Sequence, residues 1–203
     1  MWRWYERANI CYVHLEDYNF TPNLKIASTG TDSIRRQLKQ CRWFTRGWCL
    51  QELIAPNKLH FFDKDWKFVA EKSQIISTLV YITGVHGPAL RKESDLSQFS
   101  IAQRMFWASK RETTRIEDEA YCLLGIFGIN MPLLYGEGRR AFVRLQEQIV
   151  SVSADQSIFA WELRPGVLED LASIHTLFAP RAANFWWYAR DMFSTSTVAT
   201  SCH

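Results

Sequence analysis

The order of apolar and polar positions predicts alternating strands and helices in the first half of the chain. Residues 9–15 (NICYVHL) and 58–62 (KLHFF) are β-branched and aromatic runs bounded by polar residues, which is typical of buried strands. Between them, residues 16–34 are rich in Asp, Asn, Thr, Ser, Pro and Gly and predict a loop. A helix follows and ends at Pro56, because proline cannot continue a helix. Residues 67–83 have apolar side chains at helical spacing. This order favours an α/β fold in which the two strands are parallel neighbours.

The pattern of residues 100–150 is helical. Ser100 and Gln103 form a predicted capping box for a helix that reaches about Lys110. Thr114 and Glu117 form a second predicted box, for a helix that reaches Phe127. Residues 138–150 place Ala, Phe, Leu and Ile side chains on one face and charged side chains on the other. We therefore expect a mostly helical part after the α/β part.

The two ends of the chain differ from the middle. Residues 2–8 have the character of the last turns of a helix, and residues 157–163 (SIFAWEL) are strand-like. Residues 186–203 end in a run of small and polar residues, which predicts a disordered tail. We also expect the strand at residues 9–15 to be a poorly covered edge of the sheet, which favours self-association.

Composition restricts the class of protein. The 203 residues are 47% hydrophobic and 22% charged, so the chain can bury a core and is not globally disordered. No secretory signal opens the chain, and no apolar run reaches the roughly 18 residues that a membrane span needs. Five scattered cysteines fit a reducing compartment, so we expect a cytoplasmic protein with no membrane partner.

Several common site types find little support in the sequence. Cys11 and His14 lie three apart in a predicted strand and therefore point to opposite faces, so we expect no metal site. The Gly136–Gly138 turn lacks the rest of a phosphate-loop pattern and is interpreted as the entry to a helix. A basic segment interleaved with aromatic residues is interpreted as solvated surface rather than a nucleic-acid site, because the net charge is only +3; its basic residues are Arg35, Arg36, Lys39, Arg42 and Arg46, and its aromatic residues are Trp43 and Phe44.

One carboxylate is out of place in the helix that precedes Pro56. At roughly 100° per residue, Glu52 falls within the apolar arc and Gln51 on the polar side. The arc consists of Trp48, Cys49, Leu50, Leu53 and Ile54. Burying a carboxylate costs several kcal/mol unless it is paired, hydrogen-bonded or protonated. Glu52 is therefore either a structural carboxylate held by Arg42 or Arg46, or a functional one that lines a cleft beside Trp48.

Four stretches of the sequence follow one another in a specific order: RWFTRGWCLQELIAP, FFDKDW, IAQRMFWASKRETTRIEDEAYCLLGIFGINMPLLYGEG and AFVRLQEQI. Through them, residues 1–150 resemble the fungal HET (heterokaryon incompatibility) domain. The domain's earlier strands have no counterpart here, and residues 151–185 are similar to the start of the segment that follows HET domains. The resemblance implies a signalling role in nonself recognition and programmed cell death, through self-association or contact with a protein partner, without a cofactor.

HET domains are distantly similar to TIR domains, and WCLQEL resembles the WCLxEL signature of plant-type TIR domains. The glutamate of that signature is the catalytic residue of NAD cleavage, a role that falls here on Glu52. The alternative function is therefore a TIR-like NAD hydrolase, with NAD as substrate and Trp48 as a candidate ligand contact. The fold implied is a partial TIR-like parallel sheet with flanking helices.

Overall fold

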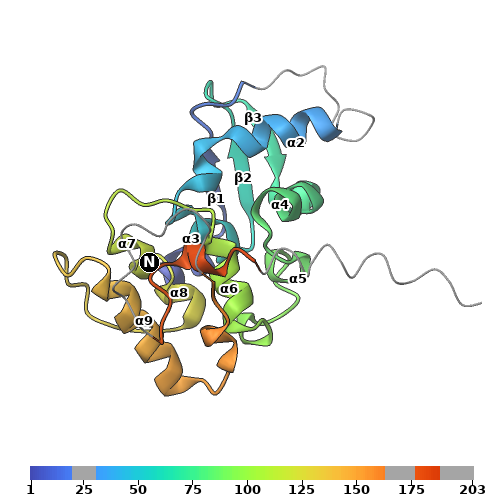
Figure 1. Ribbon diagram of the computed structural model, residues 1–203. Coiled ribbons are helices and arrows are strands. Elements are labelled where there is room, and N and C mark those ends of the chain that lie inside the picture. Colours follow the sequence, from blue (N-terminus) through green and yellow to red (C-terminus); the bar gives the residue numbers. More distant parts are fainter. Residues whose placement is uncertain (20–30, 163–176, 188–203) are drawn as a thin grey trace, which may run out of the picture. The chain divides into compact units, whose positions relative to one another are not determined.

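The structure is a computed structural model that describes residues 1–19, 31–162 and 177–187 (Figure 1). The chain forms two compact units. The first consists of Met1–Gln98 and Arg111–Thr113, and the second of Phe99–Lys110 and Thr114–His203. None of the helices in the described ranges has the length and apolar content needed to cross a bilayer.

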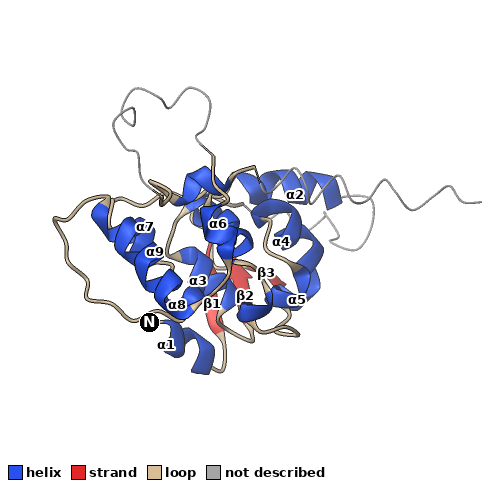
Figure 2. Ribbon diagram, turned by 60° about the horizontal axis from the view of Figure 1, so that its bottom comes forward, coloured by secondary structure: helices blue, strands red, loops and turns tan. Residues whose placement is uncertain are grey.

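The first unit contains a small mixed sheet in the order β1-β2-β3. β1 (Cys11–His14) pairs in parallel with β2 (Leu59–Phe62), so the predicted parallel neighbours are confirmed. β3 (Phe68–Glu71) pairs antiparallel with β2, which leaves β1 at one end of the described sheet as expected. Figure 2 shows the three strands in red; all other regular structure in the described part of the chain is helical.

Short helices accompany this sheet in the first unit. They are α1 (Trp2–Arg7), α2 (Thr31–Gln40), the 3-10 helix η1 (Arg42–Thr45), α3 (Cys49–Ile54), the 3-10 helix η2 (Lys72–Ile75), α4 (Ile76–Thr83), α5 (Gly87–Leu90) and the 3-10 helix η3 (Leu96–Gln98). One face of the sheet is buried through Val13, Leu59 and Phe61. Phe61 packs against the rings of Trp43 and Phe44 of η1, with ring centroids 5.7 and 6.3 Å away. The crossover between the parallel strands therefore supplies part of the core.

Two expectations for this unit are wrong in part. Residues 67–83 do not form one helix, because residues 68–71 pair with β2 as β3 before the chain turns into η2 and α4. The turn before β3 is fixed by the buried carboxylate of Asp63, whose Oδ1 accepts from the backbone N–H groups of Asp65 and Lys67. Strand pairing here overrides helical periodicity. The predicted loop of residues 16–34 also ends early, since α2 begins at Thr31.

The second unit is helical throughout its described residues. Its elements are α6 (Ile101–Ala108), α7 (Asp118–Tyr121), α8 (Leu124–Phe127), α9 (Arg140–Val152) and the 3-10 helices η4 (Gln156–Phe159) and η5 (Ala182–Phe185). The Ser100 capping box is confirmed: Ser100 Oγ accepts from Gln103 N at 3.2 Å, and Gln103 Oε1 accepts from Ser100 N at 2.7 Å. The amphipathic helix is confirmed as α9, whose Ala141, Phe142, Leu145 and Ile149 are buried.

Two further expectations fail in the second unit. Residues 114–127 form two short helices starting at Asp118, and no side chain caps the start of α7. SIFAWEL begins as the helix η4 instead of a strand, because the Asp155 carboxylate accepts from Ser157 N and from Ile101 N. These bonds bend the chain into a turn at the point where a strand would need to extend. Most of the predicted disordered tail, residues 188–203, lies outside the described residues.

Candidate functional site

Glu52 lies in α3, a six-residue helix whose other side chains are buried. Cys49, Leu50, Gln51, Leu53 and Ile54 are all buried, while Glu52 itself is half-buried. The prediction that Gln51 faces solvent is therefore wrong, because its side chain is only 3% exposed. Glu52 is the one side chain of this helix with partial access to solvent, which makes its carboxylate the candidate for contact with a ligand.

Each oxygen of the Glu52 carboxylate accepts one hydrogen bond from an aromatic side chain. The Tyr5 hydroxyl donates to Oε1 at 3.4 Å, and the Trp43 indole Nε1 donates to Oε2 at 3.3 Å. Tyr5 belongs to α1 and Trp43 to η1, so three separate elements meet at this carboxylate. Both distances exceed the usual range for hydrogen bonds, so the two contacts are weak. The carboxylate is therefore oriented by neutral donors and not held in a tight ion pair.

The nearest titratable neighbours of Glu52 stay protonated at neutral pH. Burial, followed by the negative charge of Glu52, raises the pKa of Tyr5 to about 12. Burial and then Glu52 also raise the pKa of the Cys49 thiol to about 12, against the opposing charges of Arg111 and Arg46. The pKa of Cys11 is raised by the same two causes, against the charge of Lys72. These groups surround Glu52 with neutral side chains, and the thiols are poor nucleophiles.

α3 is fixed at both of its ends. Before it, Gly47 N donates to Glu112 O at 2.8 Å and Glu112 N donates to Thr45 O at 2.7 Å, while the Arg111 guanidinium donates to Arg46 O. After it, the amine of Lys72 donates to Pro56 O at 2.9 Å. Lys72 is buried, and burial lowers the pKa of its amine to about 8. Distant parts of the first unit therefore hold the helix that presents Glu52.

The alternative in which an arginine holds Glu52 is not what the structure shows. Arg42 is exposed and pairs with Glu16 at 3.4 Å. Arg46 is also exposed, and its backbone bonds to Arg111 and bridges to Glu112. No ion pair involves Glu52 within the described ranges.

Other predicted residues are not assembled with Glu52 into a larger site. Trp48 directly precedes α3 and is half-buried, but the tryptophan that donates to Glu52 is Trp43. A role for Glu52 in catalysis and a role for Trp48 in ligand binding stay predictions. Among the described residues, no group of three or more His, Cys, Asp or Glu side chains is placed to hold a metal ion. In the basic segment, Arg35 and Lys39 lie over the ring of Tyr81.

Sequence reasoning missed the two donors to Glu52. Trp43 appeared only as an aromatic residue within a basic segment, and the break at Gly47 separates its helix η1 from α3. Tyr5 precedes Glu52 by 47 residues, so no local pattern joins them. Trp43 lies nine residues before Glu52 and could be identified as a nearby aromatic donor from the sequence, whereas Tyr5 could not.

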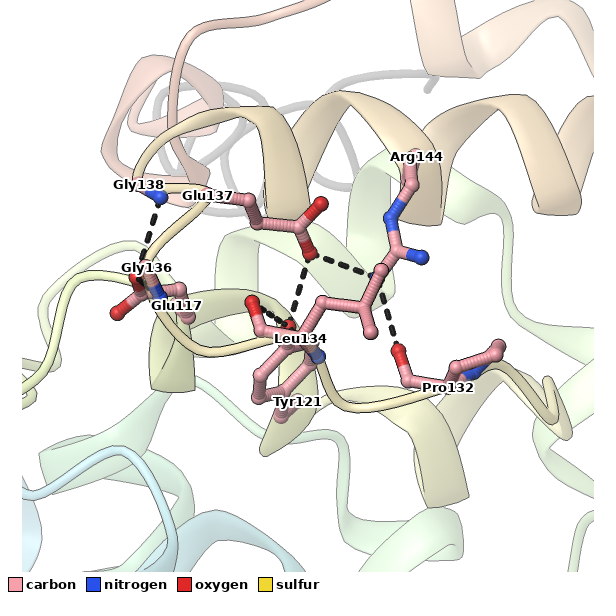
Figure 3. A network of polar contacts seen from close by, with 8 residues as sticks. All are labelled: Glu117, Tyr121, Pro132, Leu134, Gly136, Glu137, Gly138 and Arg144. Carbon is pink, nitrogen blue, oxygen red and sulfur yellow. Dashed lines mark hydrogen bonds and ion pairs between the residues drawn. The ribbon is translucent and has the colours of Figure 1, made fainter.

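The second unit contains a different polar network, drawn in Figure 3. Glu117 Oε1 accepts from Gly136 N at 2.8 Å and from Gly138 N at 3.1 Å. Both glycines have a positive φ, +101° and +60°, a conformation that glycine adopts without strain. The turn therefore leads into α9 as predicted, and its N–H groups are occupied by a carboxylate of the same chain. Glu117 has this role in place of the predicted capping box with Thr114.

The same network includes the carboxylate of Glu137. Its Oε1 accepts from Tyr121 OH at 2.9 Å and from Arg144 Nη2 at 2.7 Å, and Arg144 also donates to Pro132 O at 2.8 Å (Figure 3). Tyr121 OH accepts from Leu134 N at 2.7 Å. These bonds link the loop before α9 to α7 and α9. Because the carboxylate of Glu137 is held by short bonds from side chains of the same chain, the network has a structural role.

Comparison with known proteins gives one strong match. Over 150 residues, 73% of this chain, the sequence is 43% identical to the vegetative incompatibility protein HET-E-1 of Podospora anserina. The aligned part is 11% of that protein, so the chain spans about a tenth of the length of this curated relative. Residues 140–201 match a family described as a domain of unknown function (DUF8212). No solved structure matches the chain. The chain is therefore related to a fungal vegetative incompatibility protein, while the likeness to TIR domains stays a prediction.

Proposed function

We propose that this chain is a signalling module of fungal heterokaryon incompatibility, in which incompatible fused cells undergo programmed death. The observation that carries the proposal is the 43% identity to HET-E-1 over 150 residues. In this proposal residues 1–150 are a HET domain, and the module acts in the cytoplasm by self-association or by contact with a protein partner. The compact first unit, with a firmly held α3, supports a folded signalling module.

Expression in a fungal host tests this proposal. The 203-residue chain is placed under an inducible promoter, and viable colonies are counted with and without inducer. We expect induction to reduce viability. The matched control is Trp4→Ala, because Trp4 is 78% exposed and its loss should leave the fold intact. Normal growth of cells in which immunoblotting and protease resistance show folded, accumulated protein would contradict the proposal.

A second candidate function is hydrolysis of NAD with Glu52 as the catalytic carboxylate. The observation in its favour is that no arginine or lysine pairs with this half-buried carboxylate among the described residues. Its oxygens accept long hydrogen bonds from Tyr5 and Trp43, and the neutral thiol of Cys49 is a further hydrogen-bond partner. A structural carboxylate would normally be saturated by closer donors or by a cation. Glu52 therefore keeps capacity to interact with a positive charge on a ligand.

The chemistry fits a carboxylate of this kind. Cleavage of the bond between nicotinamide and ribose releases neutral nicotinamide and leaves oxocarbenium-like positive charge on the ribose, as in glycoside hydrolysis. A carboxylate beside the ribose stabilises that charge in the transition state. Water then adds to the ribose carbon and loses a proton, which gives ADP-ribose. In this scheme Tyr5 and Trp43 orient the carboxylate.

Nicotinamide release from NAD tests the second candidate. Purified chain is incubated with NAD and the products are separated by chromatography. We expect release by the wild-type chain and a loss of at least about a hundredfold in Glu52→Gln, since such electrostatic groups contribute about that much to rate. Glu162→Gln is the matched control, because this glutamate belongs to the second unit. Equal release by wild type and Glu52→Gln, or none by either, would contradict this candidate and leave the signalling proposal untouched.

A further inference from the structure

One face of the sheet in the first unit is covered with aromatic rings. The buried face packs on the core, whereas the opposite face presents six ring-bearing side chains, here called the aromatic face: Tyr12, His14, His60, Phe62, Trp66 and Phe68. Phe62 lies in the middle, with its centroid 5.6 to 5.9 Å from the rings of Tyr12, Phe68 and Trp66. Tyr12 is 63% exposed, Trp66 62% and Phe68 48%. A contiguous exposed patch of this kind marks an interaction site in soluble proteins.

Two local irregularities of the backbone place rings on this face. The register between β2 and β3 shifts at Phe61/Phe62, so that Phe62 lies opposite Phe68. Because of this bulge, Val69 and Ala70 are both buried and Phe68 is exposed. Bulges re-aim side chains in this way. Trp66 has φ +59°, an unfavourable conformation for a residue with a Cβ, and its indole stacks on His14 at 4.5 Å. The aromatic face is therefore assembled at a conformational cost.

Charges of both signs lie near the aromatic face. Lys64 is exposed and its carbonyl lies 3.3 Å from Nε2 of His14, while Glu71 lies opposite His60 in the sheet. None of its six members is a carboxylate, a lysine or an arginine. Next to Trp66, Lys67 pairs with Asp65 at 3.5 Å, and beyond the end of β1, Arg42 pairs with Glu16 at 3.4 Å. A rim on which charges of both signs alternate offers no strong net attraction to a highly acidic or basic partner. The aromatic face is electrostatically matched by another neutral aromatic surface.

We propose that the aromatic face is a homotypic interface, with a second copy of this chain as its partner. A second copy presents the same neutral surface, and a twofold axis brings identical patches together without any further requirement. Edge-to-face ring contacts, which already dominate within the face, extend across such an axis. The proposal deepens the proposed signalling function, on which it rests, by naming the surface and the partner of self-association.

The exposed area of the aromatic face sets the expected affinity between two copies of the chain. At about 200 Å² for a whole ring, the three most exposed rings offer on the order of 350 Å² per copy. Stable dimers bury about 800 Å² per partner, so rim residues must contribute and the association should be weak. We expect a reversible dimer whose dissociation constant lies in the micromolar range.

Sedimentation velocity over a series of protein concentrations tests the proposal. Trp66→Gly removes one of the most exposed rings of the face, and glycine accepts φ +59° without strain, so the variant should fold. We expect its dimer dissociation constant to rise at least about tenfold, as for other aromatic interface residues. Lys92→Gly is the matched control, since Lys92 has φ +60° and lies outside the face. A wild-type chain that stays monomeric, or a Lys92→Gly variant that weakens the dimer equally, would overturn the proposal.

Substitutions that introduce opposite charges into the aromatic face test whether its partner is a second copy of the chain. Tyr12→Lys and Tyr12→Glu are each expected to be monomeric, because like charges meet across the twofold axis. Their equimolar mixture should recover association if the partner is a second copy. Tyr81→Lys and Tyr81→Glu, at an exposed tyrosine of α4, should leave the dimer unchanged. A mixture that stays monomeric would overturn the proposal, as would tighter binding of a single-stranded oligonucleotide than of a second copy, measured by fluorescence anisotropy.

The same variants separate this inference from the proposed function. If Trp66→Gly is monomeric and harmless in the fungal host, both are supported. If it is monomeric and still lethal, the interface is supported by sedimentation, self-association through it is not how the module acts, and the signalling proposal stands. If the wild-type chain dimerises but has no effect on viability, the signalling proposal fails and the interface is supported by sedimentation alone.

Discussion

Two partly buried carboxylates, Glu52 in the first unit and Glu137 in the second, are held in opposite ways. Glu137 Oε1 accepts from an arginine at 2.7 Å and from a tyrosine at 2.9 Å. The oxygens of Glu52 accept from neutral aromatic donors at 3.3 and 3.4 Å. Short, charge-assisted bonds contribute more to stability than long neutral ones. The difference teaches that partial burial alone does not identify a functional acid, whereas the donors around it separate an anchored carboxylate from an available one.

The largest effect is expected from breaking the Glu137–Arg144 pair. Arg144→Met keeps much of the side-chain volume but leaves Glu137 without its cation, so the free energy of unfolding should fall by about 2–4 kcal/mol. Urea titration monitored by circular dichroism measures this. Arg140→Met, an exposed change on the same helix, should stay within about 0.5 kcal/mol. A small effect of Arg144→Met would mean that the second unit does not depend on its network.

Acidification should weaken the hydrogen bonds between the Glu117 carboxylate and the turn at Gly136 and Gly138. Backbone N–H bonds, from Glu117 itself and then from Gly136 and Gly138, hold the pKa of Glu117 below its usual 4.5. A lowered folded-state pKa adds stability that is complete above the unfolded-state value and is lost as pH falls through the folded-state pKa. We therefore expect Glu117→Gln to destabilise the chain at neutral pH, and the difference from wild type to shrink below about pH 4.5.

Urea titrations of both proteins between neutral and acidic pH measure that difference. Comparing the two proteins also removes the contribution of Glu119, whose pKa is raised by burial and whose effect on stability has the opposite sign. A constant difference between wild type and Glu117→Gln at all pH values would show that the charge of Glu117 does not matter for the turn.

A smaller effect on stability is expected at Glu52. Glu52→Gln keeps an acceptor for one aromatic donor and leaves no cation unpaired, so the free energy of unfolding should change by about 1 kcal/mol or less. Thermal and urea unfolding check this. A loss of several kcal/mol would place Glu52 in the same class as Glu137 and remove the contrast between the two regions.

The smallest effect is expected at Thr114. Its side chain is exposed and α7 begins at Asp118 without a side-chain cap, so Thr114→Ala should change stability by less than about 0.5 kcal/mol. Ser100→Ala, which removes a real cap, should cost about 1 kcal/mol. If the two changes lowered the free energy of unfolding equally, Thr114 would act as a helix cap, as its sequence pattern predicts.

The sequence predicted those features that depend on neighbouring residues. The strands at β1 and β2, the Ser100 capping box and the apolar face of α9 follow from patterns within a few residues. β3 was missed because its partner β2 decides its conformation, and FVAE has no strict alternation of its own. The capping box predicted for Glu117 and Thr114 was wrong. The donors to Glu117 are Gly136 and Gly138, which lie too far along the chain for a local pattern to reveal.

The candidate site was predicted only in part for the same reason. The apolar arc of α3 singled out Glu52, since that signal lies within one helix. Its donors Tyr5 and Trp43 and the support from Glu112 depend on contacts between distant segments. Helical geometry indicated which residue was out of place. It gave no means of telling which side chains would meet it.

The bonds between Glu112 and the segment before α3 have a consequence for the order of folding. Thr45 and Gly47 gain their backbone partners only when residue 112 is available, long after β1 and β2 have emerged from the ribosome. Contacts of such sequence separation are slow to form, because a long loop must close first. The sheet can thus pair while the start of α3 still lacks its support. During synthesis, Glu52 would be among the last residues of the first unit to reach its native surroundings.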